Sequence, residues 1–307
     1  MDNLAAKLAK GYFTLKDLGV KFADIRRLMD KGYRVNSRRV NGQVFYSILT
    51  ANENISLHLS GLSSKVQEFK WVELSDLHAG SRQFDETGLR DILHRAVDKG
   101  YRKVFISGDL TDGYGVYKGH LSNLRLWRME DQAALLTEIL SDYDLEYYAI
   151  MGNHDASFLK DGGLSPLVLV QNELPNFAYL PSMAADVVIG GVVKRMVHLD
   201  GGGAYSISYP GQKYIRNVLH ASGQNIYIHG KKYRMRFLQL GHLHFLATYE
   251  SGGIQVTHPG NYQFPNDFTL RKGLVGPQGS IFVTTTIQQG HVLSYMPSEE
   301  KPQRNWK

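Results

Sequence analysis

The sequence of 307 residues contains no cysteine, which excludes disulfide bonds and thiolate metal sites. Any metal ion would therefore be held by histidine, carboxylate, asparagine or backbone oxygen ligands, a set that suits Mn, Fe, Zn or Mg. The sequence also lacks a secretory signal and any uninterrupted run of about 18 or more apolar residues. We therefore expect a cytoplasmic protein with no membrane partner. The hydrophobic content of 43% predicts a substantial core.

The excess positive charge lies entirely in residues 1–50. The whole chain has a formal net charge of +6, and this segment alone contains ten Lys/Arg and four Asp/Glu, so the remainder is neutral. A small basic module joined to a neutral body is one layout of nucleic-acid-binding proteins. A solvated basic surface without a partner would carry the same charge, so the charge alone leaves both interpretations open.

The basic segment has the pattern of short helices followed by a β-hairpin. Thr14 can cap a very short helix that Gly19 ends, and residues 21–32 carry apolar side chains at helical spacing. Strand-like alternation then surrounds Asn41 and Gly42, a strong hairpin signal. This order resembles a winged helix-turn-helix, which can enter a major groove or dock a protein. The residues that would contact nucleic acid are Lys21, Arg26 and Arg27 by the second helix and Arg38 and Arg39 in the wing.

The pattern changes twice along the chain, which predicts three parts. Residues 1–50 form the winged-helix-like module, and residues 51–69 are polar and predict a linker or an irregular crossover. In residues 70–307, apolar strands alternate with helices and then give way to a strand-rich second half. We therefore predict an α/β fold in which two packed mixed β-sheets are flanked by helices.

The apolar strand runs of this body end in side chains that can bind metal. "SDLH", "GDLTD" and "GNHD" follow three runs in the first half, and His198 and "GHLH" follow two runs in the second. Ligands of open α/β sheets bind at such strand ends. Asp-x-His and His-x-His direct two side chains to one side, and the preceding glycines permit close backbone approach. We call these metal-ligating side chains donors. Their number suits two ions about 3.5–4 Å apart, an arrangement that favours phosphoryl-transfer chemistry.

These motifs identify a resemblance to the calcineurin-like metallophosphoesterases. The "SDLH", "GDLTD", "GNHD" and "GHLH" blocks match four of the family's five signature blocks, within residues 71–244, and "HLDGGGAYSISYPGQKYI" resembles phage and prokaryotic members. The fifth block is a single histidine, for which His198, His220 and His229 are candidates. We favour His198 because it ends an apolar run and precedes a glycine-rich loop.

The resemblance implies a role for each matched residue. The implied ligands of the first ion are Asp76, His78 and His244, and those of the second are Asn153, His198 and His242, with Asp109 bridging both. His154 would not bind metal but would stabilise or protonate the leaving oxygen. Asp155 would orient His154, and Asp112 would support the ligands. A hydroxide that bridges the ions would attack phosphorus in line, with manganese preferred and iron, zinc, magnesium or nickel as alternatives.

The family hydrolyses several kinds of phosphoester, so the substrate has to come from other features. The basic module and the phage-type likeness favour a phosphodiesterase acting on nucleic acid, in particular a DNA nuclease. The alternative is a phosphatase or a small-molecule or cyclic-nucleotide phosphodiesterase whose N-terminal module docks a protein, and a homodimer is also open. A non-catalytic scaffold would be expected to have lost ligands that this chain retains. Residues 113–128, aromatic and basic, would line the substrate groove or form an ordinary surface loop, and His258 has no assigned role.

Overall fold

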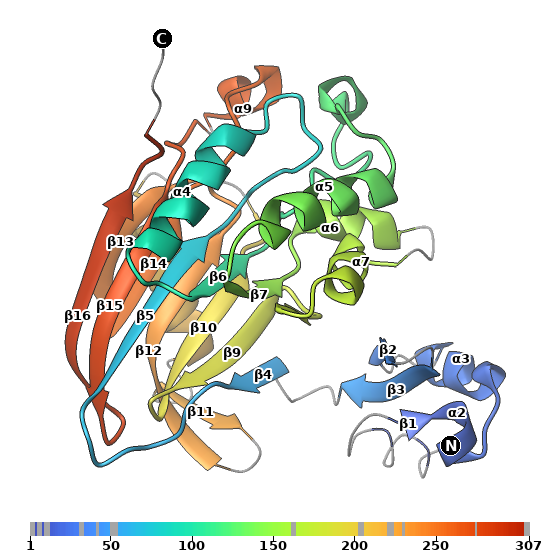
Figure 1. Ribbon diagram of the computed structural model, residues 1–307, viewed down its shortest axis with the longest axis horizontal. Helices are drawn as coiled ribbons and strands as arrows, with labels where there is room; N and C mark the ends of the chain where they lie inside the picture. The colour runs from blue at the N-terminus through green and yellow to red at the C-terminus, as the bar shows by residue number, and fades with distance from the viewer. Residues whose placement is uncertain are drawn as a thin grey trace. The chain divides into compact units, whose positions relative to one another are not determined.

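The computed structural model describes Leu4, Leu8 and residues 13–30, 34–40, 43–49, 55–160, 164–201, 206–219, 224–228, 231–273 and 275–303. The chain divides into two compact units, Met1–Ile55 and Ser56–Lys307, whose relative placement is not determined (Figure 1). The first unit corresponds to the basic part of the sequence, and the second carries the motif-bearing strands.

The first unit contains short helices and a small antiparallel sheet in the order β1-β3-β2. Its elements are β1 (Phe13–Thr14), α2 (Leu15–Leu18), α3 (Phe22–Asp30), β2 (Arg34–Val40) and β3 (Gln43–Leu49). Thr14 and Asp17 form a reciprocal capping box at the start of α2, and Gly19 ends that helix with a φ of 64°. The predicted Thr14 cap and Gly19 stop are therefore confirmed. Leu8 and Ile25 are fully buried in the core of this unit.

Parts of the winged-helix prediction lie outside the described residues. Among them are the expected hairpin turn at Asn41 and Gly42 and the side chains of Arg26, Arg38 and Arg39. The strands on either side of that turn pair as predicted, with Val40 opposite Gln43. The assignment of this unit as a winged helix-turn-helix stays a prediction.

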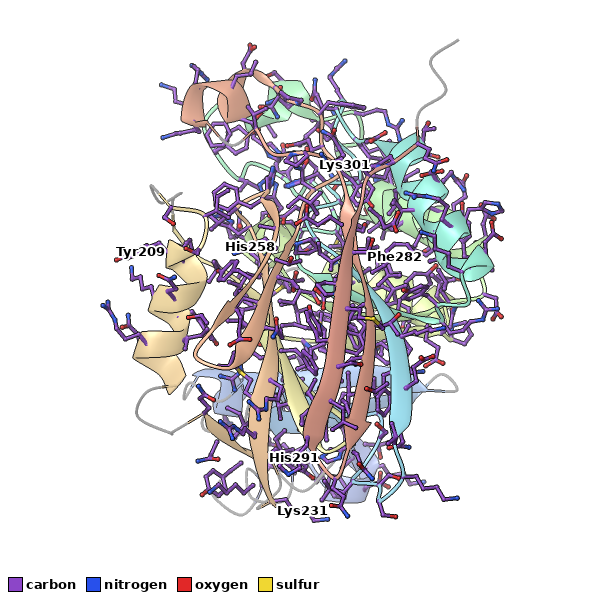
Figure 2. All side chains as sticks on the ribbon, turned by 90° about the vertical axis from the view of Figure 1, so that its left-hand side faces the viewer. Tyr209, Lys231, His258, Phe282, His291 and Lys301 are labelled. Carbon is purple, nitrogen blue, oxygen red and sulfur yellow. The ribbon has the colours of Figure 1, made fainter. Side chains whose placement is uncertain are left out.

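The body is built on two mixed sheets. The first sheet has the order β16-β15-β5-β6-β7-β8, in which the strands from β5 to β8 are parallel and β15 is antiparallel to β5 (Figure 1). Its strands are β5 (Gln67–Leu74), β6 (Lys103–Ser107), β7 (Glu146–Ile150), β8 (Phe177–Leu180), β15 (Ser280–Gln288) and β16 (His291–Glu300). Figure 2 shows β16 on the edge of this sheet, running from His291 toward Lys301.

The second sheet has the order β13-β14-β12-β10-β9-β4, with β11 paired to β12. Its strands are β4 (Ile55–His58), β9 (Ala184–Ile189), β10 (Val192–His198), β11 (Asn225–Ile228), β12 (Lys231–Gly241), β13 (Leu246–Ser251) and β14 (Ile254–Pro259). The pairs β10–β12 and β12–β14 are parallel, so strand ends in this sheet also meet at one edge. The prediction of two mixed sheets is confirmed.

Helices cover the outer faces of both sheets. The longer helices α4 (Glu86–Asp98), α5 (Met129–Ser141) and α7 (Pro166–Glu173) bury apolar faces against the first sheet. The short elements are η1 (His120–Asn123), α6 (Asn153–Ala156), η2 (Ser157–Leu159), α8 (Tyr209–Tyr214), η3 (Ile215–Leu219) and α9 (Asp267–Lys272). Tyr214 and Ile215 pack on the core of the second sheet. Within the described residues, no helix is long and apolar enough to cross a membrane.

Two parts of the predicted linker, residues 51–69, belong to the sheets instead. Ile55–His58 form β4, which lies beside β9, and the amide of Leu59 donates to the carbonyl of Val188 at 3.0 Å. Strand β5 already begins at Gln67. The linker prediction is wrong for these residues because pairing with β9 and with β15 determines their conformation, which their polar composition does not reveal.

A buried polar cluster joins the inner faces of the two sheets. Glu73 of β5 accepts a hydrogen bond of 2.8 Å from the indole of Trp71 and one of 2.5 Å from the ammonium group of Lys194 on β10. Thr257 of β14 donates to the second carboxylate oxygen of Glu73. Aromatic rings surround the cluster, and Trp71 meets Phe237 edge-on at 5.3 Å. These hydrogen bonds connect the two sheets near the ends of their strands.

Candidate metal centre

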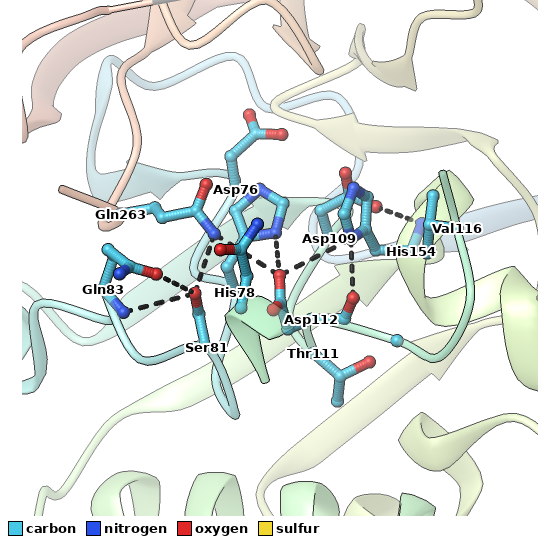
Figure 3. Close-up of polar contacts among 12 residues, drawn as sticks. Asp76, His78, Ser81, Gln83, Asp109, Thr111, Asp112, Val116, His154 and Gln263 are labelled. Atoms are coloured by element: carbon cyan, nitrogen blue, oxygen red, sulfur yellow. Dashed lines mark hydrogen bonds and ion pairs between the residues drawn. The ribbon is translucent and has the colours of Figure 1, made fainter. Parts of the chain in front are cut away.

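The predicted ligand residues come together at one edge of the sandwich. Parallel strands β5, β6 and β7 end there in the first sheet, and parallel strands β10 and β12 end there in the second. His198 and Gly241 are register partners across the β10–β12 pair. Figure 3 shows how residues from the loops after β5, β6 and β7 point toward one another. Equal strand direction therefore converts separate sequence motifs into one site.

One set of donors consists of Asp76, His78 and His244, whose ligand atoms lie within 4.8 Å of one another. The Nε2 atoms of His78 and His244 are 3.1 Å apart, and Nε2 of His244 is 3.7 Å from Oδ1 of Asp76. All three side chains are buried. The structure therefore brings together the three residues expected to hold the first ion.

A second set contains Asp109, His198 and His242, also within 4.8 Å of one another. Oδ1 of Asn153 lies 3.0 Å from Nε2 of His198 and 2.9 Å from Nδ1 of His242. Asp109 also belongs to a third set with His78 and His154. It therefore lies between the two groups of donors, where a bridging ligand is expected.

The backbone of these loops is strained at the donor residues. Among the described residues, a positive φ occurs at seven non-glycine positions, and five of them are donors. Those donors are Asp76, His78, Asp109, His242 and His244, with φ between 51° and 87°. Such conformations cost roughly 1–3 kcal/mol each and collect at functional sites, where a surrounding structure holds them. The strained backbone conformations direct these side chains toward one cavity.

Two glycines have the close contacts that the sequence predicted for them. A Cβ atom on Gly108 would overlap the imidazole of His198, and one on Gly152 would overlap the carboxylate of Asp109. The φ of Gly108 is 89°, which a side chain would also oppose. These positions therefore need glycine because a donor of another loop occupies the space.

Asp112 links three imidazoles beneath the donors. Its Oδ1 lies 3.1 Å from Nδ1 of His78 and 3.6 Å from Nδ1 of His154, and its Oδ2 lies 3.3 Å from Nε2 of His120. Although burial raises the pKa of Asp112, the neighbouring imidazoles of His120 and His78 hold that pKa below the usual range. The predicted supporting position of Asp112 agrees with these contacts.

His120 is a residue that the sequence did not point to. It is fully buried in η1, and the amide of Val116 donates to its Nδ1 at 3.3 Å. Nε2 therefore carries the proton and faces Asp112. No motif surrounds this histidine, so only the fold reveals its contact with the centre.

His154 is fixed by its own backbone and by the loop after β6. Its amide donates to Oδ1 of Asp109 at 2.7 Å, and its Nδ1 lies 2.6 Å from the carbonyl oxygen of Asp112. Because a carbonyl only accepts, Nδ1 carries the proton and Nε2 is available to the cavity that His154 lines. Burial lowers the pKa of His154 to about 4. An anion at Nε2 would raise this pKa, because it favours the charged ring.

Asp155 contacts a different group from the one expected. Rather than orienting the ring of His154, it accepts hydrogen bonds from the amide of Gly152 at 2.9 Å and from the amide and hydroxyl of Thr111 at 2.8 and 2.7 Å. It therefore ties the loop after β7 to the loop after β6. Burial and the neighbouring Asp109 raise the pKa of Asp155 to about 6.

The electrostatics of the donors suit a cation. Burial would lower the pKa of His78 and of His198, but nearby carboxylates raise the first to about 8 and the second to about 9. A site that draws protons onto buried imidazoles also favours a metal ion, which takes the place of those protons. The sulfur-free nitrogen and oxygen donors suit Mn, Fe or Zn, so the residues present fit a pair of divalent ions.

The donors open into a cavity of about 280 Å³. Residues from three remote parts of the chain complete its walls. The lining residues beside the donors are Val116, Tyr117, Gly201, Gln263, Phe268, Thr269 and Lys272. Val116 and Tyr117 belong to residues 113–128. Part of this segment therefore lines the cavity, which agrees with the first of the two interpretations of its sequence.

The remaining sequence candidates lie elsewhere or have other contacts. His220 and His229 fall outside the described residues. His94 is exposed on α4, as expected. His258 is buried on β14, with Nε2 3.2 Å from the hydroxyl of Tyr249, and burial lowers its pKa to about 4. In the first unit Lys21 and Arg27 are exposed, and Arg27 pairs with Asp24 at 3.1 Å.

Residues 69–268 match the model of the calcineurin-like phosphoesterase family. The chain belongs to this family. The match covers the donor sets and the strands from β6 to β14, and it confirms the family that the four motifs indicated. Members of this family are metallophosphoesterases, which bind divalent metal ions, in agreement with the donor clusters of this chain.

The curated relatives are similar in sequence to only a part of this chain. The DNA polymerase II small subunit of Halobacterium salinarum is 32% identical over 135 residues, which are 41% of this chain and 26% of the relative. The protein of the same name from Thermoplasma acidophilum is 32% identical over 123 residues, 36% of this chain and 24% of the relative. The matches thus span about a quarter of the length of these relatives.

Solved structures show weaker likeness. Vps29 of Entamoeba histolytica, crystallised with zinc, is 15% identical with a TM-score of 0.41, covering 76% of this chain and 99% of that one. An archaeal phosphodiesterase is 12% identical with a TM-score of 0.42, covering 76% of this chain and 100% of that one. These values add nothing to what the family match shows.

Proposed function

We propose that this chain is a dinuclear metal-dependent phosphodiesterase that acts on nucleic acid. The observation that carries the proposal is the arrangement of two donor sets around Asp109, with His154 beside them and facing the same cavity. Structural metal sites close their coordination with protein ligands, whereas this centre borders open space. The arrangement supports a reaction on a bound phosphoester.

Each donor set has its own proposed ion. Asp76, His78 and His244 would hold the first, and Asn153, His198 and His242 would hold the second, with Asp109 shared. Two bound divalent ions supply a nucleophile at neutral pH and neutralise charge that develops on the phosphoryl oxygens. Asp112 and His120 keep His78 in its orientation through the Nδ1 contact, which leaves Nε2 of His78 for the ion.

His154 is the proposed catalytic residue that does not bind metal. Its Nδ1 donates to the Asp112 carbonyl, so the ring presents Nε2 to the cavity at a fixed angle. A phosphoester there would receive a hydrogen bond from the protonated ring, which would stabilise or protonate the leaving oxygen. Burial lowers the pKa of the free ring to about 4, and a bound anion would act in the opposite direction because it favours the protonated ring.

Two observations support nucleic acid as the substrate. The excess charge of the chain lies in its first unit, where Lys21 and Arg27 are exposed. The curated relatives that match the body carry the name DNA polymerase II small subunit, which associates their phosphoesterase-like part with a DNA enzyme.

The test is manganese-dependent cleavage of labelled DNA by the full chain and by His154→Ala. The variant should retain manganese binding in calorimetry and lose about 10²–10⁴-fold in kcat, the usual contribution of a positioned acid. His94→Ala, on the exposed face of α4, is the matched control and should behave as the parent chain. A fully active His154→Ala would contradict the role of His154, and absence of DNA cleavage with rapid turnover of a small diester would contradict the substrate.

A second candidate is a phosphatase or small-molecule phosphodiesterase with a protein-docking N-terminal unit. The cavity of about 280 Å³ favours it, because this volume lies near the lower end of the roughly 300–1,000 Å³ of small-molecule sites. Replacing Lys21 and Arg27 by alanine separates the two. The nuclease should lose DNA affinity and about one unit of salt slope per lost phosphate contact, whereas turnover of a small-molecule diester should stay unchanged.

A further inference from the structure

An aromatic wall lies beside the candidate metal centre and takes no part in holding it. We define the wall as Tyr117, from the loop before η1, and Phe268, from α9. Their rings are stacked with centroids 3.9 Å apart and planes inclined by 13°. Both side chains are half-buried and line the cavity that the donors also line. Because the stacked rings cover each other's inner faces, an outer ring face and the ring edges form the aromatic surface beside the place where a phosphate would be bound.

The wall is held rigidly from both sides. Nδ2 of Asn123 donates to the hydroxyl of Tyr117 at 3.1 Å. Oδ1 of Asn266 caps α9 by accepting from the amides of Phe268 and Thr269, at 2.9 Å each. The ring of Tyr117 also meets the ring of His154 at a centroid distance of 6.3 Å. A preformed surface of this kind loses little conformational entropy when a planar group stacks on it.

A cation completes the wall at the far end of α9. Lys272 lines the same cavity, and its side chain is exposed. Within the part of the chain that the structure describes, no carboxylate pairs with its ammonium group. Aromatic surface, cation and metal centre thus face one cavity, which is the combination that single-stranded nucleic acid requires: stacking for bases and positive charge for phosphates.

We propose that the Tyr117–Phe268 wall is a nucleobase site that receives one unpaired nucleotide while its phosphate reaches the metal centre. The inference rests on the proposed function and narrows it to single strands, frayed ends or extruded nucleotides. In a double helix both faces of each base are covered by neighbouring bases, so a stacking surface next to the reactive centre serves only an unpaired base. Lys272 contacts the phosphate on the other side of that nucleotide. A cavity of about 280 Å³ has room for a unit of about nucleotide size.

The experiment uses substrates with a single phosphodiester bond, so that the reacting phosphate is known. Thymidylyl-thymidine is compared with the same diester carrying abasic deoxyribose on both sides. The parent chain should show a kcat/KM roughly 5- to 150-fold higher for the base-bearing diester, the range expected from stacking of one base. Phe268→Leu, which keeps apolar volume but removes the aromatic face, should lose this preference. Phe268→Tyr should retain it.

A binding measurement without turnover provides a second readout. In the metal-free protein, thymidine 5′-phosphate should bind more tightly to the parent chain than to Phe268→Leu. Deoxyribose 5-phosphate should bind the two proteins equally, because it has no base. Lys272→Gln should weaken binding of a short single-stranded oligonucleotide and reduce its salt slope by about one. Thermal unfolding of each variant shows whether the loop and α9 remain packed.

The outcomes separate this inference from the proposed function. Equal turnover of the abasic and base-bearing diesters by the parent chain would overturn the nucleobase site and leave the phosphodiesterase function intact. The same loss on both diesters in Phe268→Leu would show that the wall only fastens the loop to α9, and would overturn the inference too. Faster cleavage of duplex than of single-stranded DNA would also overturn the nucleobase site and leave the phosphodiesterase function intact. Turnover of a phosphotyrosine peptide in place of any nucleic acid would overturn both proposals.

Discussion

Two buried groups of charged residues in the body differ in backbone conformation and in how their charges are paired. The inter-sheet cluster around Glu73 and Lys194 is on regular strands, and each of its charges has a complementary partner. The donor sets around Asp109 are on loops with positive φ, and imidazole nitrogens there approach one another at 3.1 Å. The first arrangement consists of complementary pairs, whereas the second gathers several metal-ligating side chains within 4.8 Å of one another. Buried charge therefore indicates function where backbone strain and a cluster of ligand atoms accompany it.

The largest expected effect concerns activity. Asp109→Ala removes the carboxylate that both donor sets share, so both ions should be lost and phosphodiester hydrolysis should fall to background. Thermal stability of the metal-free protein should change far less than activity does. Calorimetric manganese titration and unfolding curves of the same preparation measure the two. Retention of two manganese ions by this variant would contradict the bridging position.

The opposite behaviour is expected of the inter-sheet cluster. Lys194→Met leaves Glu73 as an unpaired buried charge, which should cost about 3–5 kcal/mol in the free energy of unfolding. Adding Glu73→Gln should restore much of that loss, because the remaining side chain is neutral. Urea denaturation of the single and double variants measures the coupling. If the single variant is as stable as the parent chain, the pair does not hold the sheets together.

Acid sensitivity provides a third contrast, through a buried histidine outside the donor sets. The pKa of His258 is lowered to about 4 by burial, below its ordinary value of 6.5. The unfolded chain therefore binds the proton first, and stability that is fully present above pH 6.5 should be lost as the pH falls toward 4. The loss is of the order of 3 kcal/mol. Unfolding of His258→Gln across this pH range should show a smaller loss, while exposed His94→Gln should follow the parent chain.

The smallest effect is expected behind the donors. His120→Gln disturbs the contact with Asp112 and so the orientation of His78, which should reduce manganese affinity or kcat by about 10- to 100-fold. Because the role is one of positioning, kcat and metal affinity should change more than KM for the substrate. His94→Gln is again the control. Unchanged kinetics and metal binding would show that Asp112 holds its position without His120.

Sequence reasoning found the donors because their signal is local. Polar residues that directly follow apolar strands, such as Asp76 and Asp109, identify strand ends whatever the rest of the fold does. His120 and the pairing of Tyr117 with Phe268 depend on contacts between distant segments, which no periodicity encodes. The strand Ile55–His58 was missed for a related reason, since β9 supplies the partner that makes it a strand. Asp155 was expected to orient the ring of His154, but it binds the amide of Gly152 and the amide and hydroxyl of Thr111.

The donor sets of the two proposed ions each take residues from both sheets, so metal binding would connect the sheets. Asp76 and Asp109 follow strands of the first sheet, whereas His198, His242 and His244 follow strands of the second. A bound ion therefore fastens the open edge of the sandwich, and its binding free energy adds to the free energy of folding. Free metal at about 100 times its dissociation constant contributes roughly 2.7 kcal/mol per site. Occupancy of the proposed metal centre and the stability of the sandwich would thus depend on the same quantity, the concentration of free metal.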